Sequence, residues 1–283
     1  MQSHHSSALV DDARAARRDP APPPPRLEAR WADSQGDVRE AQRLRHRVFA
    51  VEMGARLAVT PGTPAGHDAD RFDDFCDHLL VRAVPGTGDR GHVVGTYRVL
   101  TPAAARRAGG FYSETEFDLR RLAPMRSRMA ELGRSCIAPA WRTGGTILAL
   151  WSALGEFMVR HDLDVAFGCA SVSIDDGGDR AASLWRRLSA LHLAPPERRV
   201  LPLDPLDLAP LRSDLEVVTP ALIKGYLRCG AELLGPPARD AAFGCADLPL
   251  LMTLAGLPQR HRRHFRGALQ AANLEPFSRS LPG

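Results

Sequence analysis

The chain of 283 residues is 44% hydrophobic and 25% charged, with a formal net charge of +4, which is typical of a soluble globular protein and too weakly basic to indicate nucleic-acid binding. Its five cysteines are scattered without a CxxC pair, so they indicate neither a disulfide framework nor a zinc motif, and no segment has the apolar length of a membrane span or a signal-peptide core. We therefore expect a reduced, cytoplasmic protein without a metal site, whose mild positive charge suits an acidic protein partner or peripheral contact with an anionic membrane.

The N-terminal segment divides into a tail and a helix. Residues 1–27 are polar and end in a proline-rich run, which predicts a disordered or polyproline-type tail before folding begins near Leu27. From Asp37, an N-cap candidate, apolar residues recur at helical spacing as far as Phe49 and predict an amphipathic helix. A loop rich in glycine and proline, residues 60–66, follows this helix.

The middle of the chain predicts a hairpin and then alternating helices and strands. Two strand-like runs, residues 78–84 and 92–100, flank a Pro-Gly segment and indicate a β-hairpin. The elements expected next are a short helical turn at 117–122, a strand at 129–138, an amphipathic helix at 146–161, a strand at 164–171 and a helix at 180–191.

The C-terminal third adds further strands. Its expected elements are a short strand at 216–218, a helix at 221–229, strands at 231–234 and 243–251, and a basic helix at 259–271, followed by a flexible tail at 272–283. This order predicts one α/β (α+β) domain over residues 28–271, with a central mixed, largely antiparallel sheet flanked by helices.

An ordered set of charged residues runs through this domain: Arg45, Asp68, Asp70, Asp73, Arg98, Glu131 and Arg134. Several of them occupy positions where packing alone would ask for apolar side chains. Charged groups are seldom tolerated near a core unless they are paired or have a function. The residues alone leave two interpretations open, a buried ion-pair network and a polar active site, and they slightly favour the network.

Two further features are candidates for chemistry. Glu131 lies on a predicted central strand, where its carboxylate could act as a general base or could form a buried pair with Arg134. The turn that carries Arg142, Gly144 and Gly145 comes between a strand and a helix, and the free N–H groups at a helix start favour an anion such as a phosphate. Glycines serve ordinary strand-to-helix turns as well, so this turn is a weak signal by itself.

The charged set and Phe49 resemble, in their order, the residues shared by the acyl-homoserine-lactone-synthase-like branch of the GNAT acyltransferase superfamily, with Asp68 where autoinducer synthases carry glutamate. More closely, the chain resembles bacterial L-ornithine N-alpha-acyltransferases, the hemolysin-like enzymes that begin ornithine lipid synthesis. The matching stretches are residues 45–56, DRFDDFCDHLLV at 70–81, VGTYRVL at 94–100, GFYSETEFDL at 110–119, ELGRSCI at 131–137, FGCAS at 167–171 and PALIKGYLRCGAELL at 220–234. The resemblance runs from roughly Arg39 to Phe265, nearly all of the expected domain.

This resemblance implies a GNAT acyltransferase fold and transfer of a 3-hydroxyacyl group to the alpha-amine of L-ornithine, which gives lyso-ornithine lipid. The turn after Arg142 lacks the full glycine-rich signature of members that use coenzyme A. That difference suits an acyl-carrier-protein thioester as co-substrate, and the resemblance implies no further cofactor. An acidic carrier protein would then be the partner of the basic surface.

The resemblance also assigns expected roles to residues. Glu131 is the expected base, since the attacking amine is mostly protonated at neutral pH. The residues expected to bind ornithine are Arg45, Phe49, Asp68, Asp70, Asp73, Arg98 and Arg134, and those expected to hold the phosphopantetheine phosphate are Arg142, Gly144 and Gly145.

Two rival functions fit parts of the same sequence. An acyl-homoserine lactone synthase would use S-adenosylmethionine in place of ornithine, but such enzymes usually lack a continuation like residues 220–251. A non-catalytic, membrane-associated hemolysin-like protein would account for the basic helix at 259–271 and leave the charged set without a purpose.

Overall fold

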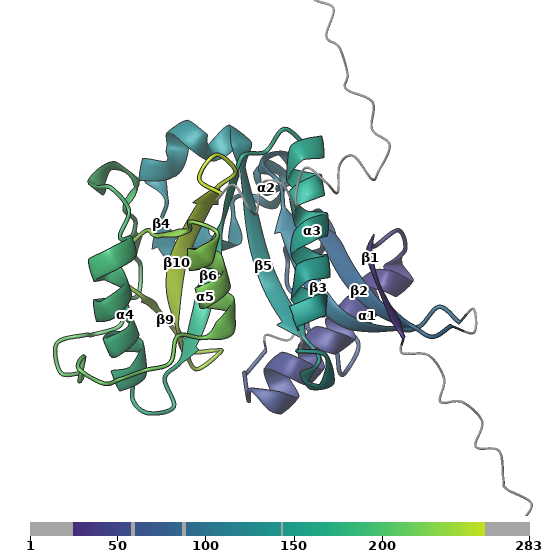
Figure 1. The fold of residues 1–283 in the computed structure, drawn as a ribbon, viewed down its shortest axis with the longest axis horizontal. Coiled ribbons are helices and arrows are strands. Elements are labelled where there is room, and N and C mark those ends of the chain that lie inside the picture. The colour runs from purple at the N-terminus through teal and green to yellow at the C-terminus, as the bar shows by residue number, and fades with distance from the viewer. Residues whose placement is uncertain (1–24, 58–59, 87–88, 143, 258–283) are drawn as a thin grey trace, which may run out of the picture.

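A computed structural model describes residues 25–57, 60–86, 89–142 and 144–257 of the chain. Its centre is a mixed sheet in the order β1-β2-β3-β5-β6-β10-β8, with β9 paired to β10 (Figure 1). The strands of this sheet are β1 (Arg26–Trp31), β2 (Asp77–Val84), β3 (His92–Leu100), β5 (Met129–Ile137), β6 (Val165–Ser173), β8 (Glu232–Leu233), β9 (Ala238–Asp240) and β10 (Cys245–Thr253). All of its strand pairs are antiparallel except β5 with β6, which confirms the predicted sheet.

Helices cover both faces of the sheet. The helices are α1 (Gln35–His46), α2 (Pro102–Ala108), α3 (Gly144–Arg160), α4 (Asp179–His192) and α5 (Ala221–Arg228), together with the π-helical η1 (Arg47–Glu52) and the 3-10 segments η2 (Asp73–Phe75), η3 (Tyr112–Thr115), η4 (Arg120–Arg128), η5 (Pro139–Trp141) and η6 (Pro196–Arg198). A small second sheet pairs β4 (Phe117–Asp118) with β7 (Leu201–Pro202). None of the helices in the described ranges is long and apolar enough to cross a membrane.

The alternation of side chains along β2 (DHLLVRAV) explains why its central run, residues 79–81, is apolar without a break. Leu79 and Val81 pack against α3, which lies across one face of the sheet (Figure 1). Leu80 points to the opposite face and packs against Leu44 of α1. Because successive residues of a strand point to opposite faces, a strand covered on both sides needs apolar residues at nearly every position.

The start and end of α1 differ in detail from the prediction. Its N-cap is Ser34, whose hydroxyl accepts a hydrogen bond from the Asp37 amide at 3.3 Å, so the expectation that Asp37 is the cap was wrong. At its other end the helix continues into η1, which widens to π-helical geometry and carries Val48 and Phe49 into the core. Such π-helical turns are frequent at functional sites.

Some other predicted elements differ from the structure, and some fall on segments that the structure does not describe. Residues 216–218 form no strand, and the turn expected at 117–122 is β4 followed by η4. Strand β1 begins at Arg26, just inside the segment expected to be a tail. The rest of that segment, residues 1–24, lies outside the described residues, as do the basic helix expected at 259–271 and the tail at 272–283.

The sheet divides between β5 and β6. These two strands are paired only where Met129–Glu131 meets Val165–Phe167, and beyond that point β5 stays with β3 while β6 stays with β10. Figure 1 shows the two strands diverging from this seam. At Gly168, the first residue after the seam on β6, an added Cβ would lie 2.3 Å from the carbonyl oxygen of Leu132.

We expect Gly168→Ala to lower the free energy of unfolding by about 2–3 kcal/mol, because the new methyl group would press the backbone of one strand away from the other. Chemical denaturation measures this change. Gly133→Ala on the adjacent strand is the matched control, since nothing lies within 4 Å of its added Cβ, and its effect should stay below about 1 kcal/mol. Equal effects of the two substitutions would contradict this account of the seam.

Candidate active site

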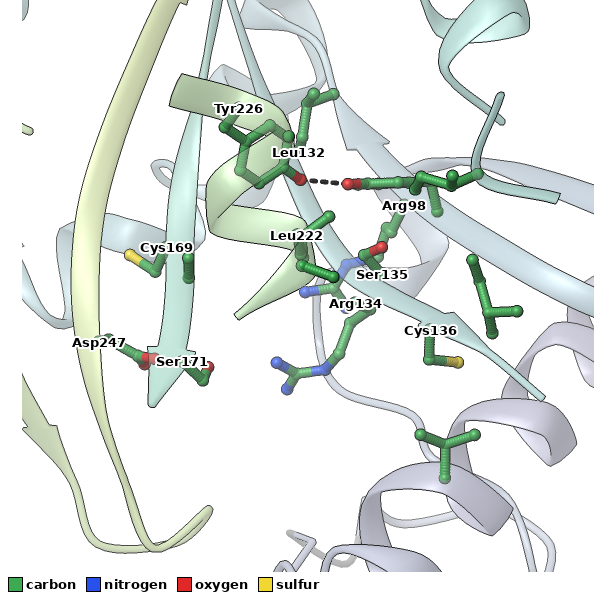
Figure 2. Close-up of a pocket in the computed structure, with 18 of the residues that line it drawn as sticks. Arg98, Leu132, Arg134, Ser135, Cys136, Cys169, Ser171, Leu222, Tyr226 and Asp247 are labelled. Atoms are coloured by element: carbon green, nitrogen blue, oxygen red, sulfur yellow. Dashed lines mark hydrogen bonds between the residues drawn. The ribbon is translucent and has the colours of Figure 1, made fainter. Parts of the chain in front are cut away.

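A cavity of about 750 Å³ lies where β5 and β6 separate. Residues 132–137 of β5 and 169–171 of β6 form two of its walls, and α5 contributes Leu222 and Tyr226. Figure 2 shows Arg134 reaching from β5 into the space between the strands, with Asp247 and Ser171 on the other side. The division of the sheet therefore creates the cavity, and side chains from both halves line it.

The predicted charged set forms a continuous network of ion pairs beside this cavity. Arg45, which has 0% of its side chain exposed, joins Asp68 and Asp73, with N–O distances of 2.8 Å to each. Asp70 receives Arg98 at 2.7 Å and Arg134 at 3.1 Å. The interpretation that the sequence slightly favoured, an ion-pair network, is therefore confirmed for these six residues.

Only part of that network faces the cavity. Arg98 and Arg134 line the cavity, whereas Arg45 and the three aspartates of the network do not. Phe49, the apolar residue expected to bind ornithine, also lines the cavity. Each of these aspartates is already engaged by arginine. The network thus presents two guanidinium groups to the cavity, and guanidinium groups bind carboxylates and phosphates well. The expected contacts of the aspartates with substrate stay a prediction.

Arg134 occupies an unusual backbone position on β5. Its φ of 49° lies in the left-handed region of backbone conformation, which residues other than glycine seldom adopt. The pairing register between β3 and β5 is irregular nearby. Its guanidinium lies 5.0 Å from the ring of Tyr112 and 4.9 Å from that of Phe243. Strain of this kind persists where surrounding contacts fix it, and it often marks a functional site.

Glu131 sits at the seam, 4% exposed, and lines the cavity. Its carboxylate accepts hydrogen bonds from the amides of Tyr112 and Ser113, both at 2.6 Å, and from the Ser113 hydroxyl at 2.5 Å. Burial raises the pKa of Glu131 above its ordinary value, and the hydrogen bonds from Ser113 and Tyr112 act in the opposite direction. The carboxylate is therefore held in one orientation at the start of η3. Its role as a base stays a prediction.

The expected phosphate-binding turn is assembled around an ion pair. The guanidinium of Arg142 forms two bonds to the carboxylate of Glu52, at 2.6 and 2.8 Å, and donates to the carbonyl oxygen of Ile137 at 3.1 Å. Arg142 and Gly144 line the cavity, whereas Gly145 is not among the lining residues. The pair is half-exposed, so a competing anion can reach Arg142 from solvent.

The second half of the sheet brings polar residues to the cavity that were not predicted from the sequence. Asp240 and Asp247 line it from the β9–β10 side, and Tyr226 hydrogen-bonds to Tyr97 through the two hydroxyl groups. One signal was available: Asp247 is the only charged residue in the apolar run predicted as a strand at 243–251. A lone carboxylate in a buried strand is a candidate for function on the same physical grounds as the N-terminal charges.

Similarity to known proteins covers most of the chain. Residues 44–152 match the acetyltransferase (GNAT) domain family. The L-ornithine N(alpha)-acyltransferase of Brucella abortus (strain 2308) is 38% identical over 84% of this chain and 88% of that protein, and the one from Agrobacterium fabrum is 35% identical over 87% of each. The solved structure of the acyl-homoserine lactone synthase LasI has a TM-score of 0.48 at 13% identity, covering 81% of this chain and 91% of that one.

Proposed function

The chain belongs to the L-ornithine N(alpha)-acyltransferase family, and from that membership we propose that it transfers an acyl group from a thioester to the alpha-amine of L-ornithine. The observation that carries the proposal is the identity of 34–38% to four curated L-ornithine N(alpha)-acyltransferases, each over at least 84% of this chain. The cavity adds chemical support, since it combines guanidinium groups with carboxylates and has room for a small amino acid beside a thioester.

The reaction joins the amine nitrogen to the thioester carbonyl carbon and breaks the bond from that carbon to sulfur. Ornithine's alpha-amine is mostly protonated at neutral pH, so a base must take a proton before or during attack. Glu131 is our candidate, directly or through one water, because it is fixed at the cavity wall. A second proton of the amine goes to the leaving thiolate, which departs as a thiol, and the third stays on the amide nitrogen. The scheme requires no metal and no covalent enzyme intermediate.

Ornithine's carboxylate is proposed to bind Arg98 and Arg134, the two guanidinium groups of the network that face the cavity. The tetrahedral intermediate needs donors for its oxyanion, and backbone N–H groups at and just after the end of β5, from Cys136 to Ala140, are the proposed source. Within that segment Pro139 has no N–H and the Ala138 amide already donates to the carbonyl oxygen of Val94 at 2.8 Å, so the proposal concerns the other amides. Arg45 and the aspartates Asp68, Asp70 and Asp73 would then act mainly by holding these arginines in place.

The acyl donor is proposed to be a 3-hydroxyacyl-carrier protein, which would make lyso-ornithine lipid the product. Arg142 and the start of α3 at Gly144 and Gly145 would hold the phosphopantetheine phosphate. A carrier protein delivers only its phosphopantetheine arm to the cavity, and its acidic surface suits a chain with net charge +4. Because the product is a lipid, peripheral contact with the membrane is part of the same proposal.

A direct assay tests this function. Purified protein is incubated with 3-hydroxyacyl-carrier protein and either L-ornithine or S-adenosylmethionine, and the products are identified by mass spectrometry. Lyso-ornithine lipid supports the proposal, and an acyl-homoserine lactone would replace it with the autoinducer-synthase alternative. No product with either amine would remove both.

We expect Arg142→Ala to raise KM for the acyl-carrier protein about tenfold, because one charge-assisted phosphate contact contributes about 1.5 kcal/mol. KM for ornithine should not change, and steady-state kinetics with each substrate varied in turn measures both values. Glu52→Gln is the matched control, since it removes the partner of Arg142 and keeps the guanidinium. If Glu52→Gln raised KM for the donor as much as Arg142→Ala does, the ion pair and not phosphate binding would be the role of Arg142.

A further inference from the structure

Two carboxyl groups line the cavity on the side formed by the second half of the sheet, and a third interacts with them without lining the cavity itself. Asp247 of β10 is 4% exposed, and its neighbours are Ser171 and the thiol of Cys245, which donates to its Oδ1 at 3.6 Å. Asp240 lies close by, with a carboxylate oxygen, the Cys245 sulfur and an Asp247 oxygen all within 4.8 Å of one another. Glu116, which follows η3, is the third member and interacts with Asp247. We call Glu116, Asp240 and Asp247 the acidic wall.

The acidic wall lacks the cations that such groups normally require. Within the described part of the chain, none of its three carboxylates forms an ion pair, whereas Asp68, Asp70 and Asp73 are all paired with arginine. The Oε2 atom of Glu116 is buried without a hydrogen-bond partner. A buried carboxylate is costly unless it is paired with a positive charge or protonated, so this wall is well suited to a cationic group.

The pKa shifts of the acidic wall agree with its suitability for a cation. Burial, together with the negative charge of Asp247, raises the pKa of Glu116 to about 8. Burial also raises the pKa of Asp247 above its ordinary value. Carboxyl groups that lie together without a cation hold on to protons, and a bound cation would reverse that effect.

We propose that the acidic wall binds the side-chain ammonium group of ornithine and so selects this amino acid over neutral ones. The inference rests on the proposed function and deepens it, because it names the groups that recognise the substrate's far end. Arg98 and Arg134 line the cavity from the β5 side, and Asp240 and Asp247 line it from the β9–β10 side. Ornithine carries its carboxylate at one end and its side-chain ammonium group at the other. The carboxylate can therefore face the arginines while the side-chain ammonium faces the acidic wall, and the reverse orientation would put like charges together.

A metal ion is the alternative occupant of Asp240, Cys245 and Asp247, and the chemistry of the groups favours ammonium. Thiolate is the form of cysteine that binds metals, and burial raises the pKa of the Cys245 thiol, which keeps it protonated. One oxygen of Asp240 already accepts from the amides of Ala242 and Phe243 at 2.9 and 3.0 Å. An ammonium group carries three N–H donors of its own and needs only acceptor oxygens, which the wall supplies.

The test compares L-ornithine with L-2-aminopentanoate, which is ornithine without its side-chain amine. For the wild-type protein and for Asp247→Asn, kcat/KM is measured with each amine at saturating acyl donor. We expect Asp247→Asn to lower kcat/KM for ornithine on the order of 100-fold, because the variant removes one partner of a buried charge pair. The value for 2-aminopentanoate should stay within about threefold, because this amine has no side-chain ammonium group. Glu116→Gln should act in the same direction.

Controls separate this result from loss of structure. Asp214→Asn, at an exposed aspartate, should leave both values unchanged, and thermal unfolding of each variant checks that it is folded. A fall of equal size for both amines would mean that Asp247 is structural and would overturn the inference. Activity that is lost with a chelator and restored by a divalent ion would assign the wall to a metal and overturn it as well.

The design also keeps the two proposals apart. A wild-type protein that does not acylate ornithine contradicts the proposed function itself. A wild-type protein that acylates ornithine, with an Asp247→Asn variant that prefers ornithine as strongly as before, contradicts only the acidic wall. Calorimetric titration of ornithine without acyl donor gives a second measurement, in which the Asp247 variant should bind on the order of 100-fold more weakly.

Discussion

Replacing Arg45 with methionine is expected to lower the free energy of unfolding by about 3–5 kcal/mol, because it takes from the buried Asp68 and Asp73 their nearest cation and leaves them only the longer contacts to Arg134 and Arg98, at 3.5 and 3.8 Å. A domain of this size has a total stability of only about 5–15 kcal/mol, so the variant should remain measurable but close to the limit of folding. Urea denaturation followed by circular dichroism gives the value. Methionine keeps most of the apolar stem and therefore isolates the loss of charge.

The matched control is Arg120→Met, at an arginine that pairs with Asp118 on the surface with 90% of its side chain exposed. Exposed pairs of this kind contribute about 0–1 kcal/mol. If both arginine variants had effects below 1 kcal/mol, the network around Arg45 would not be a determinant of stability. A large effect of Arg45→Met would account for the burial of these charges by stability alone, without any contact of Asp68 or Asp73 with substrate.

Glu131→Gln is expected to lower kcat at least 100-fold, because general-base catalysis contributes about 10²–10⁴-fold and an amide cannot accept the proton. The variant should also lose some stability, since the amide NH₂ would face the N–H groups of Tyr112 or Ser113 where the carboxylate accepts hydrogen bonds. Stopped-assay kinetics and thermal unfolding measure the two effects separately.

Ser113→Ala distinguishes a base from an anchor. This substitution removes the hydroxyl that donates to Glu131 at 2.5 Å and leaves the two amide donors. Because donation from Ser113 lowers the pKa of Glu131, its loss should raise that pKa and move the acidic limb of the kcat/KM profile to higher pH. An unshifted limb, together with near-normal kcat for Glu131→Gln, would show that Glu131 only holds η3 in place.

Elements with strong periodicity or long apolar runs were predictable from the sequence. The hairpin of β2 and β3, the helix α3 and the strands β5 and β6 all lie within a few residues of their expected bounds. Strand β1 was missed because it lies at the sheet edge, where RLEARW needs little apolar surface. The strand expected at 216–218 was wrong, because a short β-branched run forms a strand only beside another strand, and Val218 is instead 90% exposed.

Helix α2 was missed although its signals were present in the sequence. Thr101 caps it, Pro102 occupies its first turn and Gly109 ends it in the left-handed conformation. The short run of alanines between them carries little periodic pattern, which is why the terminal signals went unused.

The candidate site was predictable in part. The sequence indicated which charged residues belong together, because charges at positions expected to lie near the core need partners of opposite sign. Which arginine pairs with which aspartate depends on where the strands meet. The sequence could therefore not show that Arg45 forms ion pairs with Asp68 and Asp73, or that Arg98 and Arg134 face the cavity. Asp247 could be recognised as a lone charge in an apolar run, but its place at the cavity depends on the separation of β5 and β6, a feature of the backbone that no single motif encodes.

The short seam between β5 and β6 has a consequence for how the protein can diverge among its relatives. Beyond three paired residues on each strand, the two sides of the cavity belong to separately hydrogen-bonded groups of strands. A change of side chain on β10 is therefore transmitted weakly to the arginines beside β5. Selection can alter which amine one side admits while the other side keeps its chemistry, so new acceptor preferences can arise through few substitutions and without rebuilding the fold.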